Sequence, residues 1–309
     1  RDVLPFLFMF LPVFLYGLLR DRPRAIAYVL GAILIVGFCF AIRASLDHLD
    51  ASLSFLGILP EAGELTYLAN SPTVLFAALF LLGAGARRFV TQAGIKNAGV
   101  AMGMIALGAL ILLPMILSAQ RASLGYVTLY VCILVGLGLW RSPYRSLFLI
   151  ALVAACLAPI YGVIGGAAHM VIDKTSLVGF NMRFEEIAAV WGVVSDGPLN
   201  LIFGQGWGAG FESPAVGGVH VNYTHSLFSS ALLKMGLLGL ALVAFYMFSM
   251  AMILARGLFR YPLLTLALAG PFAINALLYA SFKSLDFGLI LLLIIVLQIS
   301  HQNSGQEPR

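Results

Sequence analysis

The sequence has little charge, since only 10% of its 309 residues are Asp, Glu, Lys or Arg, against roughly 25% in an average soluble domain. It also has only three cysteines, and none stands at metal-ligand spacing. Because Cys39, Cys132 and Cys156 lie inside apolar runs, we expect them to be buried small hydrophobic residues. The basic residues form short clusters between apolar runs, so the net charge of +5 does not indicate nucleic-acid binding.

Apolar residues make up 61% of the chain and the mean hydropathy is +1.00, so lipid is the expected solvent. A helix needs about 20 apolar residues to cross a bilayer core. Nine runs approach this length, and they are residues 3–19, 25–43, 72–86, 98–117, 124–140, 146–166, 226–255, 262–281 and 287–300. The sequence therefore predicts an all-α polytopic membrane protein with about nine transmembrane helices.

Lys and Arg are concentrated in every second short loop, which is typical of cytoplasmic loops. The alternate loops are richer in Asp and Glu, and we place them in the periplasm. This alternation of loops puts residue 1 outside, so we expect one or three further helices upstream of it. If three precede, the whole protein has about twelve transmembrane helices. The predicted divisions are six helices within 1–166, one large periplasmic loop over 167–225, three helices within 226–300 and a cytoplasmic tail over 301–309.

The large loop contains a predicted amphipathic helix, because apolar residues recur at helical spacing at Phe184, Ile187, Ala188 and Trp191. We expect this helix to lie over the membrane core, with Glu185 and Glu186 off its apolar face. A glycine-rich segment follows, with Gly204, Gly206, Gly208 and Gly210. It lacks the strand–helix context of a nucleotide-binding fingerprint. We interpret it as an irregular turn that needs positive φ angles, with an anion cradle as the alternative.

Three side chains on the outer side are candidates for chemistry: Arg121 after the fourth run, Arg183 at the start of the loop helix, and His225 near the start of the seventh run. Thr224 is the expected N-cap of the helix that the seventh run forms. Arginine forks can bind a diphosphate in a bidentate manner. An imidazole can take a proton from an attacking hydroxyl at neutral pH. The structural alternatives are interfacial snorkelling for Arg121, a surface pair of Arg183 with Glu186, and a structural role for His225.

Two further side chains carry weaker hypotheses. His220 is close to His225 in sequence, but no carboxylate or thiolate stands nearby at ligand spacing, so a metal site is not expected. Lys234 lies within the seventh apolar run, where a charge normally faces a partner or a cavity. We interpret it as a packing or carbonyl-bound lysine, with a substrate role as the alternative.

Four segments resemble motifs of the O-antigen ligase and polymerase superfamily. They are SAQRASLG around Arg121, NMRF with Trp191 eight residues after Arg183, FGQGWGAG, and THSLFSSALLKMGLLGL around His225. The resemblance covers most of residues 98–300. One departure is Lys234, where related proteins often carry an acidic residue. The resemblance implies that Arg121 and Arg183 bind the donor diphosphate and that His225 is the base. Trp191, Gly206, Gly208, His220 and Lys234 are possible supporting residues.

The same resemblance implies a multi-pass glycosyltransferase of the bacterial inner membrane that needs no metal or other cofactor. It would move a glycan from an undecaprenyl-diphosphate carrier to an acceptor hydroxyl on the periplasmic side. The favoured acceptor is lipid A-core, as in O-antigen ligation, and the alternative is another repeat unit, as in polymerisation. A polytopic transporter is the hypothesis from another class, although no two-fold internal repeat is evident.

Overall fold

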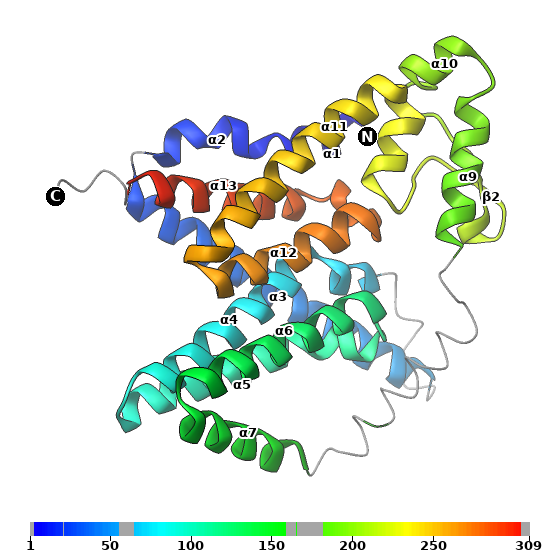
Figure 1. Cartoon of the computed structure of the whole chain (residues 1–309). Helices are drawn as coiled ribbons and strands as arrows, with labels where there is room; N and C mark the ends of the chain where they lie inside the picture. Colours follow the sequence, from blue (N-terminus) through cyan, green and yellow to red (C-terminus); the bar gives the residue numbers. More distant parts are fainter. Residues whose placement is uncertain (1–2, 21, 56–64, 159–164, 166–181, 304–309) are drawn as a thin grey trace. The chain divides into compact units, whose positions relative to one another are not determined.

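The computed structural model describes residues 3–20, 22–55, 65–158, 165 and 182–303. Helices predominate among them, and the only sheet in these residues is a two-stranded hairpin. The chain divides into two compact units (Figure 1). The first unit comprises Arg1–Tyr28, Thr175–Arg260 and Pro271–Arg309, and the second comprises Val29–Lys174 and Tyr261–Gly270.

The second unit is a group of apolar helices. Its principal elements are α3 (Pro23–Phe55, which begins in the first unit), η1 (Leu65–Asn70), α4 (Pro72–Thr91), α5 (Ile95–Leu117), α6 (Arg121–Arg141), α7 (Pro143–Leu157) and the first part of α12 (Pro262–Leu277). Short turns join α4 to α5, α5 to α6 and α6 to α7. Helix α4 begins where Ser71 accepts a hydrogen bond from the Thr73 N–H and Pro72 takes the first helical position. Helix α7 also begins with a proline. Both starts use the fixed φ of proline where the helix does not need its N–H.

Small residues let these helices pack closely. A side chain at Gly85 of α4 would meet the Ala101 carbonyl on α5, and one at Gly108 of α5 would meet Ala78 and Leu82 on α4. Such contacts are typical of helix pairs in membranes, where close packing replaces hydrophobic exclusion as the driving force. Helix α6 is tied to the first turns of α12, because the Tyr126 hydroxyl donates to the Leu266 carbonyl at 2.6 Å.

The first unit holds the loop region and the remaining helices. Its elements are α1 (Val3–Met9), α2 (Leu11–Arg20), α9 (Arg183–Val194), α10 (Pro198–Phe203), β1 (Phe211–Ser213), η3 (Pro214–Val216), β2 (Val219–Val221), α11 (Leu227–Arg260), the end of α12, η4 (Ala280–Lys283) and α13 (Leu285–Asn303). Strands β1 and β2 pair antiparallel, with Glu212 opposite His220. Helix α11 is anchored to the N-terminal helices by the Tyr246 hydroxyl, which donates to the Met9 carbonyl at 2.7 Å.

Helix α11 is broken at Gly236, whose φ of 62° and ψ of −159° are not helical. The seventh predicted run therefore lies in one long apolar helix whose two parts, residues 227–235 and 237–260, meet at this kink. The glycine-rich turn fills the break. The N–H groups of Gln205 and Gly206 donate to the Leu233 and Lys234 carbonyls at 2.9 and 3.1 Å, and so satisfy carbonyls that the break leaves without helical partners.

Backbone contact at the break explains why glycine is required there. A Cβ on Gly204 would meet the backbone at Lys234 and Gly236, and one on Gly236 would meet the Ile202 carbonyl. Gly204, Gly206 and Gly208 all have positive φ, which confirms the predicted irregular turn for three of its four glycines; Gly210 does not have a positive φ. The N–H groups of Gln205 and Gly206 are committed to α11, so this part of the turn does not act as the alternative anion cradle.

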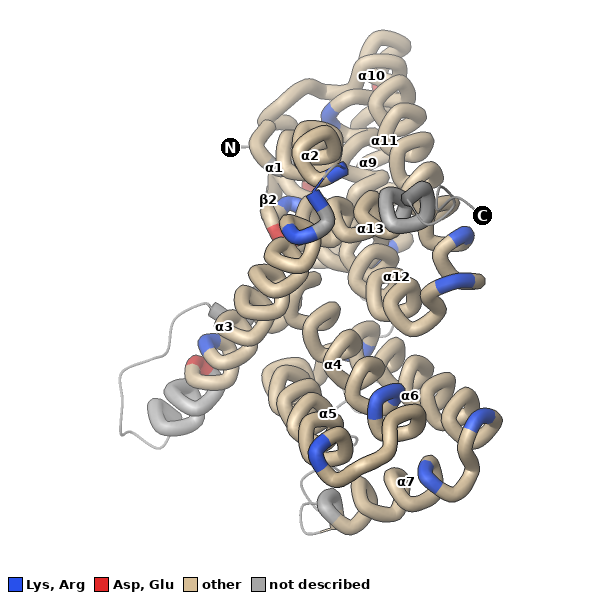
Figure 2. The backbone as a smooth tube through the Cα atoms, turned by 90° about the vertical axis from the view of Figure 1, so that its left-hand side faces the viewer, with Lys and Arg blue, Asp and Glu red and all other residues tan. Residues whose placement is uncertain are grey.

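Each of the nine predicted apolar runs contains helix within the described residues. Five described helices are long and apolar enough to cross a membrane, and they are Arg24–Asp47, Pro72–Thr91, Ile95–Leu117, Arg121–Arg141 and Leu227–Arg260. Four apolar helices are shorter, Phe6–Arg20, Pro143–Ala155, Pro262–Leu277 and Leu285–Leu297. The all-α class and a multi-pass membrane character are thus supported, while the number of spans and the orientation stay predictions. Charged residues are sparse along the helices (Figure 2).

The cysteine prediction is wrong for the two side chains that the structure describes. Cys39 on α3 and Cys132 on α6 are exposed at the helix surface. An apolar run in a membrane protein does not distinguish a packed face from a lipid-facing one, because lipid and protein interior are similarly apolar. The Cys156 side chain lies outside the described residues.

Candidate active site

Helix α9 is the predicted loop helix, and it presents an unpredicted face to the protein. Glu186, Val190 and Val194 are buried, and the two valines pack in a cluster with Phe211 and Leu233. The stripe that the sequence marks as the apolar face is exposed, with Phe184, Ile187 and Trp191 at 73%, 46% and 50%. The helix has apolar residues on two sides, so its periodicity does not tell which side the protein covers.

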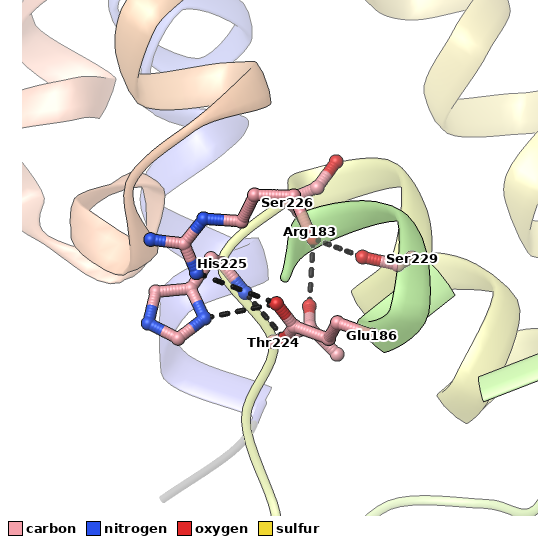
Figure 3. A network of polar contacts seen from close by, with 6 residues as sticks. All are labelled: Arg183, Glu186, Thr224, His225, Ser226 and Ser229. Carbon is pink, nitrogen blue, oxygen red and sulfur yellow. Dashed lines mark hydrogen bonds and ion pairs between the residues drawn. The ribbon is translucent and has the colours of Figure 1, made fainter. Parts of the chain in front are cut away.

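Burial of that face brings Glu186 against His225 (Figure 3). One carboxylate oxygen, Oε2, lies 3.0 Å from Nδ1 of His225. The other, Oε1, accepts the backbone N–H of His225, also at 3.0 Å. The carboxylate therefore fixes both the backbone and the ring of His225. If Glu186 is ionised it can only accept, so Nδ1 carries the proton and the neutral ring keeps an unprotonated Nε2.

Arg183, one turn earlier on α9, joins the same carboxylate. Its Nη1 lies 3.4 Å from Oε2 of Glu186, so the predicted contact forms, but the Glu186 carboxylate is buried and the pair is not the solvated surface pair that the sequence suggests. The Arg183 and His225 side chains are 22% and 20% exposed, whereas Glu186 is 3% exposed. Figure 3 shows the guanidinium and the imidazole side by side, both directed at Glu186. Both candidate side chains thus reach the surface, and the carboxylate that they share lies beneath them.

The electrostatics of this group favour an ionised Glu186. Burial by itself would raise the pKa of the carboxyl, but the hydrogen bonds and charge of His225, together with the charge of Arg183, hold that pKa below its ordinary value. A buried carboxylate without such partners would be costly and would tend to take up a proton. Glu186 can therefore stay charged and orient the imidazole.

Hydroxyl groups after His225 fix where α11 starts. The Ser226 Oγ accepts the Phe228 N–H at 3.3 Å, so Ser226 caps the helix in place of the predicted Thr224. Thr224 instead donates to the Ser226 carbonyl at 2.7 Å, and Ser229 donates to the same carbonyl at 3.1 Å. These bonds hold His225 directly before the first turn of α11.

Two aromatic contacts extend the site toward η4. The Tyr223 ring meets the His225 ring edge to face, with centroids 5.8 Å apart and a 72° interplanar angle. The ammonium of Lys283 lies 5.4 Å from the Tyr223 ring centroid, within the range of a cation–π contact. Lys283 thus adds a second basic side chain, besides Arg183, on this side of the molecule.

Arg121 belongs to the second unit, so its position relative to Arg183 and His225 stays a prediction. It is the first residue of α6 and follows a strained turn. Ala119 has a φ of 49°, an unusual value for a residue with a side chain. Gln120 is 5% exposed, and both polar atoms of its amide lack a hydrogen-bond partner among the described residues. Strain and unsatisfied polar atoms beside Arg121 are typical of a functional site.

The other candidates lie apart from the Glu186 network. His220 is exposed on β2 opposite Glu212, Trp191 is on the outer face of α9, and Lys234 is buried before the break in α11. Gly206 and Gly208 belong to the turn, with open space where a Cβ would stand. Among the described residues, no group of three or more His, Cys, Asp or Glu side chains could hold a metal ion.

Sequence reasoning missed Glu186 as a site residue. The spacing of three residues from Arg183 was the only sequence feature that pointed to Glu186. Its role depends on contact with His225, which is 39 residues away in sequence. Lys283 was also missed, because it lies outside the motifs quoted above. Gln120 lies within the segment SAQRASLG, but only the arginine was singled out there. Neither a protein-family model nor a curated protein sequence matches the chain.

Proposed function

We propose that this chain is a membrane-embedded glycosyltransferase that moves a glycan from a polyprenyl-diphosphate carrier to an acceptor hydroxyl. The observation that carries the proposal is the His225–Glu186 pair, with Nδ1 and Oε2 3.0 Å apart. An imidazole held at Nδ1 by a carboxylate presents its other nitrogen as a general base. Arg183 beside it supplies positive charge for a leaving diphosphate.

The proposed step is a displacement at the anomeric carbon. The acceptor oxygen attacks that carbon while Nε2 of His225 takes the hydroxyl proton. The bond from the anomeric carbon to the diphosphate oxygen breaks, and its electron pair leaves with the polyprenyl diphosphate. Arg183 neutralises the charge that develops on the leaving group, and Arg121 would join it if the two units place it there. A guanidinium has five N–H donors and can hold a carboxylate and a phosphate together.

Glu186 acts in this proposal as a positioning residue. It selects the tautomer in which Nδ1 is protonated, and it stabilises the imidazolium that forms during transfer, as the acid does in a Ser–His–Asp arrangement. The resemblance to O-antigen ligases suggests lipid A-core as the acceptor and the periplasmic face as the location. A polymerase would use the same residues on a different acceptor.

Transfer in proteoliposomes tests the proposal. Purified protein is supplied with an undecaprenyl-diphosphate glycan and with lipid A-core. We expect a covalent glycan–lipid product and one released polyprenyl diphosphate for each bond formed. A protein that binds the donor but gives no product with lipid A-core or with a second donor molecule would contradict the proposal.

The break in α11 is a feature that secondary transporters share, so the same vesicles need a second measurement. Counterflow of the donor or of a free glycan across the vesicle membrane would favour transport. In cells, a deletion strain separates the two acceptors. Loss of all glycan from lipid A-core indicates a ligase, whereas single repeat units on the core indicate a polymerase.

A further inference from the structure

The second unit contains an apolar pocket of about 430 Å³ between α4, α5, α6, α7 and the first turn of α12. Its lining is mostly aliphatic and includes Leu134, Val135, Leu149, Ile150, Pro262 and Leu263. This volume is within the range of about 300–1,000 Å³ that ligand pockets occupy. All the lining residues belong to one unit, so the pocket is a feature of that unit alone.

The charged groups of the pocket have one sign. Arg87, near the end of α4, and Arg141, the last residue of α6, line it, and its lining contains no Asp or Glu. Arg145 lies beside it on α7 and donates to the Val90 carbonyl at 3.1 Å. The distribution of basic residues predicts that these helix ends face the cytoplasm. An apolar cavity with arginines at the level of the inner leaflet is complementary to an anionic amphiphile.

A buried hydroxyl also faces this pocket. Ser146 is 5% exposed, lines the pocket, and its Oγ lacks a hydrogen-bond partner among the described residues. The hydroxyl is held in the wall by close packing of α7 on α6, because a Cβ on Gly138 would stand 2.8 Å from it. Buried polar atoms are usually satisfied, and this hydroxyl is available to donate to a ligand in the pocket.

We propose that the pocket binds an anionic glycerophospholipid of the cytoplasmic leaflet. An acyl chain fills the apolar volume, and Arg87 and Arg141 hold the phosphate of the head group. The Ser146 hydroxyl donates to a phosphate or ester oxygen. Basic pockets between transmembrane helices on the cytoplasmic side bind anionic head groups in this way. The site is independent of the proposed glycan transfer, because none of its residues belongs to the candidate active site.

Native mass spectrometry of the purified full chain tests the proposal, with palmitoyl-oleoyl phosphatidylglycerol and the matching phosphatidylcholine as probes. We expect retention of phosphatidylglycerol over phosphatidylcholine. The double variant Arg87→Gln, Arg141→Gln should lose that retention by about 25-fold, since each basic residue contributes roughly fivefold. Arg256→Gln, on α11 at another predicted cytoplasmic loop, is the matched control and should change retention less than about twofold.

A second variant and two competitors keep the result interpretable. Val135→Phe fills apolar volume and leaves both arginines, so it should also reduce phosphatidylglycerol retention. Glycerol phosphate, which lacks acyl chains, should not compete. Equal retention of both lipids, an unchanged double arginine variant, competition by glycerol phosphate, or displacement by an equal amount of undecaprenyl phosphate would each overturn the proposal.

Discussion

His225 and Glu186 lie 39 residues apart in sequence, yet both oxygens of the Glu186 carboxylate bind His225, one at Nδ1 and one at the backbone N–H, each at 3.0 Å. The contact joins α9 to the residue before α11. It orients the ring, and it also fixes the loop helix against the membrane helix. The predictions below separate these two roles.

Glu186→Gln should lower kcat for glycan transfer by at least about tenfold with little change in KM, because the variant keeps the shape but loses the charge that supports the imidazolium. Initial rates in proteoliposomes over a range of donor concentrations measure this. Glu186→Asp should restore part of kcat. Glu185→Gln is the matched control, since Glu185 is exposed on the same turn. A kcat for Glu186→Gln equal to that of the control would rule out the positioning role.

The stability of the loop should depend on pH below the ordinary Glu pKa of 4.5. The folded state lowers the pKa of Glu186, so its contribution is present above the unfolded value and is lost as pH falls through the folded value. The thermal midpoint of the loop, followed by tryptophan fluorescence, should therefore fall as the pH drops below about 4.5. Glu186→Gln should flatten this dependence. The same slope in wild type and variant would show that another group carries it.

Gly204→Ala should destabilise the first unit more than Gly217→Ala. Both glycines have positive φ, but Gly217 (φ 75°, ψ 28°) is in the left-handed helical region, where alanine costs about 1 kcal/mol, whereas Gly204 (φ 79°, ψ −177°) is in a region that is essentially restricted to glycine. Only at Gly204 would the new Cβ also meet the backbone of α11. Chemical unfolding in detergent measures both variants. Equal losses of stability would mean that the turn does not pack on the broken helix as described.

The exposed face of α9 should contact lipid. Phe184, Ile187 and Trp191 would be costly in water, whereas aromatic residues are stable at a membrane interface. Trp191 fluorescence, in a protein carrying Trp140→Phe and Trp207→Phe, should be quenched by brominated phosphatidylcholine in proteoliposomes. Efficient quenching by aqueous iodide, with none by brominated lipid, would show that this face is in water.

The helices of this fold could be predicted from the sequence because apolar runs and turn residues are local signals. Each predicted run contains helix, and the loop helix begins at Arg183 as its spacing indicates. The break at Gly236 could not be predicted, because it depends on the turn at Gly204, which is distant in sequence. The N–H groups of that turn bind the carbonyls at the break, and Gly204 has no side chain that would collide with the α11 backbone.

The candidate site was predictable in part, for a related reason. Arg183 and His225 stand out as polar residues at the ends of apolar segments, and the structure brings them to one carboxylate. Glu186 did not stand out, because an acid on an amphipathic helix usually faces water. Its burial follows from which side of α9 packs on Phe211 and Leu233, and that choice is tertiary.

The most direct test of the central claim compares single-turnover glycan transfer by wild type, His225→Ala and His220→Ala in the same proteoliposomes. His220 is the matched control because it is a second histidine of the loop region, exposed on β2. We expect His225→Ala to slow transfer by about 100-fold or more, the usual contribution of a general base, and His220→Ala to stay within about twofold of wild type. Transfer by His225→Ala at the wild-type rate would contradict the account.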